Sequence, residues 1–236
     1  YQRGDTVATF QFESDGMRKY LKQLTPTNIE DLIAMNALYR PGPMDNIPTF
    51  VARKHGREET HYPHEMLKPI LSNTYGIMVY QEQIMQVART MGGYSMGGAD
   101  LLRRAMGKKK MEIMEKEKVN FVNGALERGV EKKVAEDVYA LMAKFASYGF
   151  NKSHSAAYSV LAFKTAYLKA HYPAEYMAAV LTHNVSDIKK ITFFIEECRR
   201  MGIEVLPPDV NESQALFSVN PQGQIRFGLE AIKGVG

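Results

Sequence analysis

The chain has 236 residues, of which 45% are hydrophobic and 24% charged, a globular composition that excludes a disordered chain. Its net charge of +4 is too small to indicate nucleic-acid binding by itself, so the positions of the charges must decide that question. The single cysteine, Cys198, excludes an internal disulfide and a thiolate zinc site. No apolar run has the length of a membrane span, and we expect a cytoplasmic protein without a membrane partner. The chain begins at Tyr1 rather than at methionine, so we expect a piece of a longer polypeptide.

The first fifth of the chain predicts one strand and then helices. Over residues 6–12, apolar and polar residues alternate loosely, and β-branched and aromatic residues are frequent. Both features are typical of a short strand. A helix over residues 15–24 follows, and Pro26 ends it. Two prolines around a glycine at residues 41–43 then predict a stiff turn that displays Arg40.

A basic cluster follows a glycine-rich segment in the middle of the chain. After a predicted helix over residues 81–91, the segment 92–98 holds four glycines and predicts a hinge; it lacks the Gly-Lys-Ser/Thr of a phosphate loop. The next predicted helix, 99–106, carries Arg103 and Arg104, and Lys108–Lys110 come directly after Gly107. Such a run is usually a solvated face, but arginines inside a helix and lysines beyond its end also form a phosphate clamp.

Helices are predicted over residues 112–128 and 131–147, and a long helix then begins within residues 151–155 and ends before Pro173. The boundary group contains three residue types that cap helices, namely Asn151, Ser153 and Ser155. Unpaired N–H groups and the helix dipole favour an anion at this end, where Lys152 adds charge, His154 adds a donor and Tyr158 offers a ring. The alternative is an ordinary capped core helix in which the polar atoms of the histidine are hydrogen-bonded within the protein.

The composition changes near residue 202. Helices over residues 174–184 and 187–201 precede three short predicted strands, 203–206, 217–219 and 225–227, the last two joined in a hairpin by residues 220–223. We therefore predict a mainly α fold, with a helical domain over residues 1–202 and a small β element over residues 203–236.

Several segments together resemble the alpha subunit of bacterial DNA polymerase III, a member of the C family of DNA polymerases. The matching segments are residues 10–14 (FQFES), 39–43 (YRPGP), 75–83 (YGIMVYQEQ), 97–110 (GGADLLRRAMGKKK), 148–158 (YGFNKSHSAAY), 169–175 (KAHYPAE), 206–209 (LPPD) and 231–236 (AIKGVG). Because they occur in order along almost the whole chain, the resemblance is specific.

The resemblance implies that residues 1–202 are a fingers domain and that residues 203–236 lead into the start of a helix-hairpin-helix-like motif. It implies binding of deoxynucleoside triphosphates, primed template DNA, other domains of the parent chain and replisome subunits. The residues expected to bind the nucleotide are Arg103, Arg104, Lys108, Lys152, Ser153, His154 and Tyr158, and those expected to bind DNA are Arg40, Lys109 and Lys110.

The resemblance also places the catalytic aspartates, with two magnesium ions, in a palm domain upstream of residue 1. We therefore expect neither a metal site nor catalysis in this fragment alone. A non-catalytic helical module that binds nucleic acid or a protein through residues 103–110 is the alternative. A hydrolase that uses Ser153 or Ser155 with His154 is a poor third option, because no Gly-x-Ser-x-Gly elbow surrounds either serine.

Overall fold

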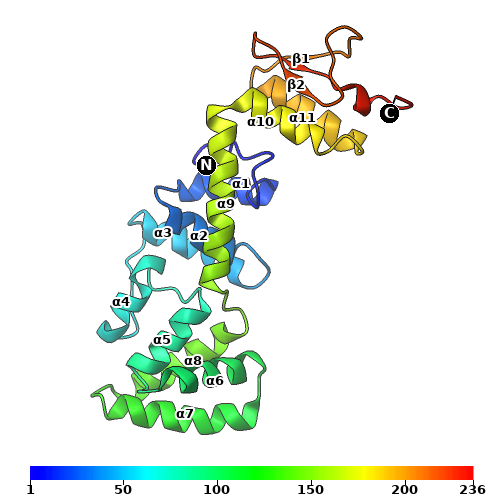
Figure 1. Cartoon of the computed structure of the whole chain (residues 1–236). Helices are drawn as coiled ribbons and strands as arrows, with labels where there is room; N and C mark the ends of the chain where they lie inside the picture. The colour runs from blue at the N-terminus through cyan, green and yellow to red at the C-terminus, as the bar shows by residue number, and fades with distance from the viewer. Residues whose placement is uncertain (236) are drawn as a thin grey trace. The chain divides into compact units, whose positions relative to one another are not determined.

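The computed structural model of the chain describes residues 1–235, and these residues are mainly helical, as the sequence predicts (Figure 1). No helix in the described part of the chain is long and apolar enough to cross a membrane. The helices of the described residues are α1 (Asp15–Leu24), α2 (Ile29–Leu38), α3 (Ile47–Lys54), α4 (Lys68–Leu71), α5 (Gln81–Thr90), α6 (Met96–Gly107), α7 (Met111–Leu126), α8 (Lys132–Ala146), α9 (Lys152–His171), α10 (Pro173–Thr182) and α11 (Ile188–Arg200).

The chain divides into two compact units. The helical unit holds residues 19–159 with Gln2, and the terminal unit holds Tyr1, residues 3–18 and the chain from Val160 onward. The N-terminal segment thus belongs to the same unit as the C-terminal segment. The predicted domain boundary between residues 202 and 203 stays a prediction.

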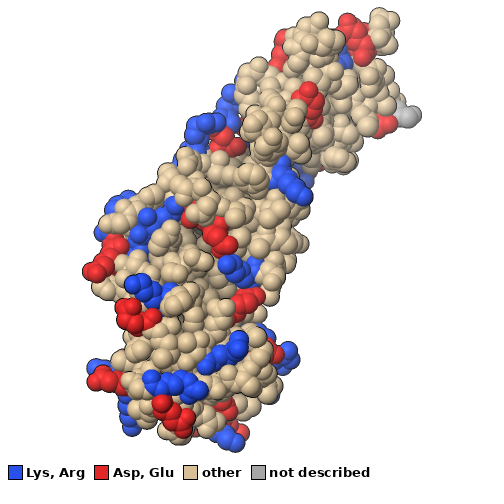
Figure 2. Space-filling view, turned by 60° about the vertical axis from the view of Figure 1, so that its left-hand side comes forward, with Lys and Arg blue, Asp and Glu red and all other residues tan. Residues whose placement is uncertain are grey.

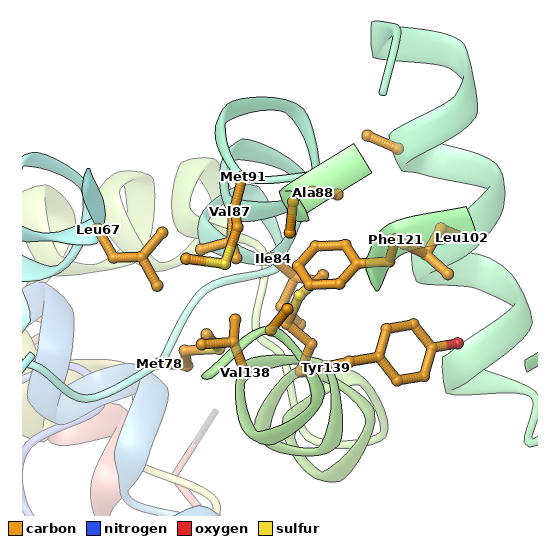
Figure 3. Close-up of a cluster of buried hydrophobic side chains, with 14 of the residues drawn as sticks. Leu67, Met78, Ile84, Val87, Ala88, Met91, Leu102, Phe121, Val138 and Tyr139 are labelled. Carbon is orange, nitrogen blue, oxygen red and sulfur yellow. The ribbon is translucent and has the colours of Figure 1, made fainter. Parts of the chain in front are cut away.

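The core of the helical unit lies among α5, α6, α7 and α8. Figure 3 shows side chains of these four helices converging, with Phe121 of α7 beside Leu102 of α6. The Phe121 ring is fully buried and lies 5.6 Å from the ring of Tyr139 in α8. Burying a large aromatic side chain stabilises a fold by a few kcal/mol, about 1.5–3. This core therefore holds α6, which carries both arginines of the basic cluster, against three other helices.

Residues 6–12 do not form the predicted strand. They form a series of turns in which Ala8 and Gln11 have φ angles of 62° and 65°. The hydroxyl of Thr6 donates a hydrogen bond to the carbonyl of Phe12 at 2.5 Å, and the Lys169 ammonium donates to the carbonyl of Val7 at 2.8 Å. Side chains thus satisfy backbone groups that a strand would pair with a neighbouring strand, so the β-branched composition of the segment was misleading.

The predicted hinge over residues 92–98 is wrong for its last three residues. Helix α6 begins at Met96, and the hydroxyl of Ser95 caps it by accepting a hydrogen bond from the Gly98 N–H at 3.1 Å. Gly93 does turn the chain, with a φ angle of 73°. A good N-cap therefore outweighs the low helix propensity of two glycines in the first turn.

The terminal unit contains a sheet of three short strands, β1 (Val205–Leu206), β2 (Ser218–Val219) and β3 (Ile225–Arg226). Strands β2 and β3 pair antiparallel, which confirms the predicted hairpin, and β1 pairs parallel with β3. Ile225 is fully buried in a cluster with Met177 and Leu181 of α10, so the sheet packs on the helices of its own unit.

Candidate functional site

Asp100 holds both arginines of the basic cluster. One carboxylate oxygen lies 2.7 Å from Nη2 of Arg103 and the other lies 2.8 Å from Nη2 of Arg104. The hydrogen bond from Arg103, assisted by Arg104, lowers the pKa of the Asp100 carboxyl below its usual value. The Arg104 side chain remains 63% exposed and that of Arg103 only 21%. Arg104 is therefore oriented by an internal carboxylate and still available to a ligand.

A pocket of about 610 Å³ lies between α6 and α7. Its basic lining comes from Arg104, Lys108 and Lys110, and its apolar lining includes Leu101 and Ile113. This volume is in the usual range of small-molecule sites. The structure thus brings together three of the predicted cations at one cavity.

The other predicted residues do not line this pocket. Arg103 lies outside the lining, and so do Lys109 and, among the described residues, the first turn of α9. On the face of the molecule in Figure 2, Lys and Arg side chains are interspersed with Asp and Glu side chains and do not form one continuous basic area. The basic cluster and the start of α9 are therefore two separate groups of candidate residues in the helical unit.

A carboxylate of the chain itself occupies the anion-binding position at the start of α9. Oδ1 of Asn151 accepts a hydrogen bond from the His154 N–H at 2.7 Å, so Asn151 is the cap within the predicted boundary group. The two carboxylate oxygens of Glu82, in α5, lie 3.1 and 3.0 Å from the backbone nitrogen of Lys152. The helix end does bind an anion, but that anion is Glu82.

Lys152 is also paired within the chain. Its ammonium lies 3.0 Å from a carboxylate oxygen of Glu30 and 5.4 Å from the centroid of the Tyr80 ring. The Lys152 side chain is 35% exposed, while Ser153 and His154 are exposed residues. The side chains that this turn offers to a ligand are therefore mainly those of Ser153 and His154.

Three rings form a row along the start of α9. The His154 ring lies 4.2 Å from that of Tyr158 and 5.5 Å from that of Phe150. The guanidinium of Arg40 lies 4.7 Å from the Phe150 centroid. Aromatic and cation contacts of this kind each contribute about 0.5–1.5 kcal/mol. The row fixes the His154 ring on one face of the helix.

Arg40 is half-buried and is not displayed as the sequence suggested. Its Nε donates a hydrogen bond to the carbonyl of Ala37 at 3.1 Å, and Nη2 donates to the carbonyl of Tyr148. Burial lowers the pKa of the Arg40 guanidinium from its usual value. The predicted contact of Arg40 with DNA stays a prediction, because these bonds use only part of its five donors.

Ser155, in the first turn of α9, has its hydroxyl engaged within the protein. Ser155 is buried, and its hydroxyl donates a hydrogen bond to the carbonyl of Ile33 at 2.6 Å. The neighbouring His154 ring lies against the ring of Tyr158, with the ring centroids 4.2 Å apart. Ser155 therefore ties α9 to α2, which argues against the hydrolase alternative.

Sequence reasoning missed the acidic residues that orient the site. Asp100 lies three and four residues before the two arginines, so the helical spacing alone could have indicated both pairs. Glu82 and Glu30 lie far from Lys152 in the sequence, and no local pattern signals their contacts. The described residues contain no group of three or more His, Cys, Asp or Glu side chains that could hold a metal ion.

Comparisons with known proteins identify the family. A sequence model of the bacterial DNA polymerase III alpha subunit finger domain matches residues 1–129, and a model of the helix-hairpin-helix motif matches residues 202–236. The DNA polymerase III subunit alpha of Escherichia coli (strain K12) is 52% identical over 242 residues, covering 100% of this chain and 21% of that protein. Those of Neisseria meningitidis serogroup A and Bacillus subtilis (strain 168) are 54% and 53% identical over 236 and 234 residues, covering 100% and 99% of this chain and 20% and 21% of those proteins.

The chain therefore spans about a fifth of the length of these relatives. The finger-domain match alone covers more than half of the 236 residues. The chain belongs to the family of bacterial DNA polymerase III alpha subunit finger domains.

Proposed function

We propose that this chain binds the incoming deoxynucleoside triphosphate and the primed template DNA for template-directed nucleotidyl transfer by a DNA polymerase. The observation that carries the proposal is Arg104. It is exposed, lies at a pocket with Lys108 and Lys110, and belongs to a finger-domain chain.

The proposed role of the basic cluster follows from the chemistry of phosphoryl transfer. Negative charge builds on the pyrophosphate as it leaves, and positioned cations stabilise that charge. Two magnesium ions, held mainly by carboxylates of a palm domain outside this chain, would activate the attacking 3′-hydroxyl. Arg104 and Lys108 supply the cations on the leaving-group side, and Arg103 contributes from its more buried position beside Asp100.

Asp100 prepares Arg104 for this contact. A guanidinium has five N–H donors, so Arg104 can keep its hydrogen bond to Asp100 and still donate two parallel hydrogen bonds to a phosphate. Because the carboxylate already restricts the side chain, the phosphate removes less conformational entropy when it binds. The pairing in the free chain is therefore compatible with nucleotide binding.

The start of α9 contributes through side chains in this proposal. Glu82 already accepts a hydrogen bond from the Lys152 N–H, so we assign the nucleotide contacts to the side chains of Lys152, Ser153, His154 and Tyr158. Arg40, Lys109 and Lys110 contact DNA phosphates. The helix-hairpin-helix match over residues 202–236 supports a further DNA contact in the terminal unit.

The proposal places the chain in the bacterial cytoplasm, as part of a replication enzyme with other domains of its parent chain and replisome subunits as partners. The chain alone should not extend a primer, because the carboxylates that hold the metal ions lie elsewhere. Incubating the purified chain with primed template, magnesium and nucleotides tests this. Robust primer extension by a preparation free of host polymerase would contradict the assignment of the metal-binding carboxylates to a domain outside this chain.

Substitution of Arg104 in the full-length polymerase tests the nucleotide contact. A charge-assisted contact to the transition state is worth about 2–4 kcal/mol, so Arg104→Ala should slow incorporation roughly thirty- to a thousand-fold. Arg104→Lys should also be impaired, because an ammonium cannot make the two parallel hydrogen bonds. Pre-steady-state incorporation of a single nucleotide measures both the rate and the nucleotide affinity.

The matched control is Arg89→Ala, which removes an exposed arginine near the end of α5. This variant should incorporate nucleotide normally. A near-normal rate and affinity for Arg104→Ala, with the fold intact, would reject Arg104 as a triphosphate ligand. That result would favour the alternative of a non-catalytic helical module that binds nucleic acid.

A further inference from the structure

The start of α9 is attached to the start of α5 by two kinds of contact. In the backbone, the Phe150 N–H donates a hydrogen bond to the carbonyl of Val79 at 3.1 Å, and the Gln81 N–H donates to the carbonyl of Phe150 at 2.9 Å. The side chain of Glu82 then adds contacts directly beyond this bridge. The two helices therefore begin side by side at a junction within the helical unit.

Glu82 organises the first turn of α9 at this junction. Besides binding the Lys152 N–H, its Oε1 accepts a hydrogen bond from Nδ2 of Asn151 at 3.0 Å. Asn151 in turn accepts a hydrogen bond from the His154 N–H through Oδ1 at 2.7 Å. One amide side chain thus connects the Glu82 carboxylate to the backbone of His154, whose ring stacks on Tyr158.

The electrostatics of the junction favour a carboxylate here. Glu82 lies in the first turn of its own helix and accepts hydrogen bonds at the first turn of α9. It therefore complements the positive dipole ends of two helices at once. The ammonium of Lys152 pairs with Glu30, while the hydrogen bonds that Glu82 accepts from Asn151 and Lys152 come from neutral N–H groups.

We propose that Glu82 is a positioning residue for nucleotide binding. It fixes the first turn of α9, and through Asn151 it sets where His154 stands relative to the incoming phosphates. The inference rests on the proposed function, because it assumes that His154 contacts the nucleotide. Glu82 itself touches no reacting atom, so its effect must pass through the turn that it holds.

A double-mutant cycle in the full-length polymerase tests this role. The variants are Glu82→Gln, His154→Ala and the combination, with Glu115→Gln, an exposed glutamate of α7, as the matched control. Glu82→Gln should raise the dissociation constant for nucleotide about ten- to a hundred-fold, as small misplacements of binding groups do. The two effects should be less than multiplicative in the double variant, because both changes act on the contact that His154 makes. Glu115→Gln should bind nucleotide normally.

A second variant tests the same connection without changing a charge. Asn151→Ser keeps a residue that caps helices but removes the Nδ2 group that donates to Glu82. It should weaken nucleotide binding several-fold in the native protein and not further when His154 is alanine. If Glu82→Gln fails to fold, this variant decides the question.

The outcomes separate this inference from the proposed function. If His154→Ala weakens nucleotide binding and Glu82→Gln does not, or if the two effects multiply, Glu82 is not a positioning residue and the proposed function stands. If His154→Ala and Arg104→Ala both leave nucleotide binding unchanged, the proposed function fails and this inference fails with it.

Discussion

A buried network of charged side chains joins segments that lie far apart in the sequence. In the terminal unit, the Lys169 ammonium lies 2.7 Å from Oε1 of Glu197, with side chains only 6% and 5% exposed. Arg200 donates to the same oxygen at 2.7 Å, and Lys169 also donates to the carbonyl of Val7. This buried network attaches the N-terminal segment to α9 and α11. Removing one charge of this network would lower the stability of the fold, because its partner would stay buried without a countercharge.

Two adjacent glutamates allow a matched test of this network. Glu197→Gln should destabilise the terminal unit by about 3–5 kcal/mol, because it leaves the buried Lys169 without its countercharge. Glu196→Gln should cost at most about 1 kcal/mol, because Glu196 pairs with Arg199 at the surface, where the side chains are 59% and 73% exposed. Hydrogen exchange of the slowest amides in α11 reports the stability of this unit. Equal destabilisation by the two variants would contradict the assignment.

The same network predicts a pH dependence. Burial opposes ionisation of Glu197, but hydrogen bonds from Arg200 and Lys169 outweigh it, so the pKa of this carboxyl is lower in the folded chain than in the unfolded chain. Its stabilising contribution is therefore complete above the unfolded pKa, near 4.5, and is lost as the pH falls through the folded pKa. Urea denaturation between pH 3 and 7 should show a smaller acid destabilisation for Glu197→Gln than for the native chain. Identical pH profiles would contradict this reasoning.

At the scale of elements, two glycines set the distance between α7 and the end of α5. A Cβ atom on Gly124 of α7 would collide with the carbonyl oxygen of Gly92, and one on Gly92 would lie 2.5 Å from the Phe121 ring. A Cβ on Gly97, in the first turn of α6, would meet nothing within 4 Å. Gly92 and Gly124 are therefore needed for this close packing, and Gly97 is not.

Substitution by alanine should have opposite effects on stability at Gly124 and at Gly97. Gly124→Ala should destabilise the helical unit by about 1–3 kcal/mol, because backbone must move to admit the methyl group. Gly97→Ala should leave stability unchanged or raise it by up to about 1 kcal/mol through helix propensity. Thermal unfolding followed by circular dichroism measures both. A neutral Gly124→Ala would show that α7 does not approach Gly92 this closely.

Local patterns predicted the elements better than the contacts between them. Three predictions are confirmed because each is decided by residues close in sequence. They are the helix over residues 15–24, the hairpin of β2 and β3, and the cap group of α9. The parallel pairing of β1 with β3 and the contact of Glu82 with α9 join distant segments, and no local pattern signals them. The candidate site was predicted as a set of cations. The spacing of Asp100 could have indicated its two pairs, but the contacts of Glu82 and Glu30 could not be read from the sequence.

For the whole molecule, the basic cluster predicts DNA binding that depends on salt. Cations that neutralise phosphates release counterions, so the logarithm of the affinity should fall linearly with the logarithm of the salt concentration. Replacing Lys108, Lys109 and Lys110 by alanine should lower this slope by up to about 1 for each phosphate that the variant no longer neutralises. Titration of labelled primed DNA at several salt concentrations measures the slope.

The matched control replaces two exposed lysines at the start of α8, Lys132 and Lys133, by alanine. Its slope should stay close to that of the native chain. An equal decrease of slope in both variants would show that general charge, and not the basic cluster, determines DNA binding.

We propose that Arg103, Arg104 and Lys108 of the basic cluster, together with the start of α9, bind the triphosphate of the incoming nucleotide. Photocrosslinking with a deoxynucleotide that carries an aryl azide on its terminal phosphate tests this most directly in the full-length polymerase with primed DNA. We predict that labelled peptides map to residues 96–110 and 151–158 and that unmodified nucleotide competes with the label. Competable label confined to peptides outside both segments would contradict the claim.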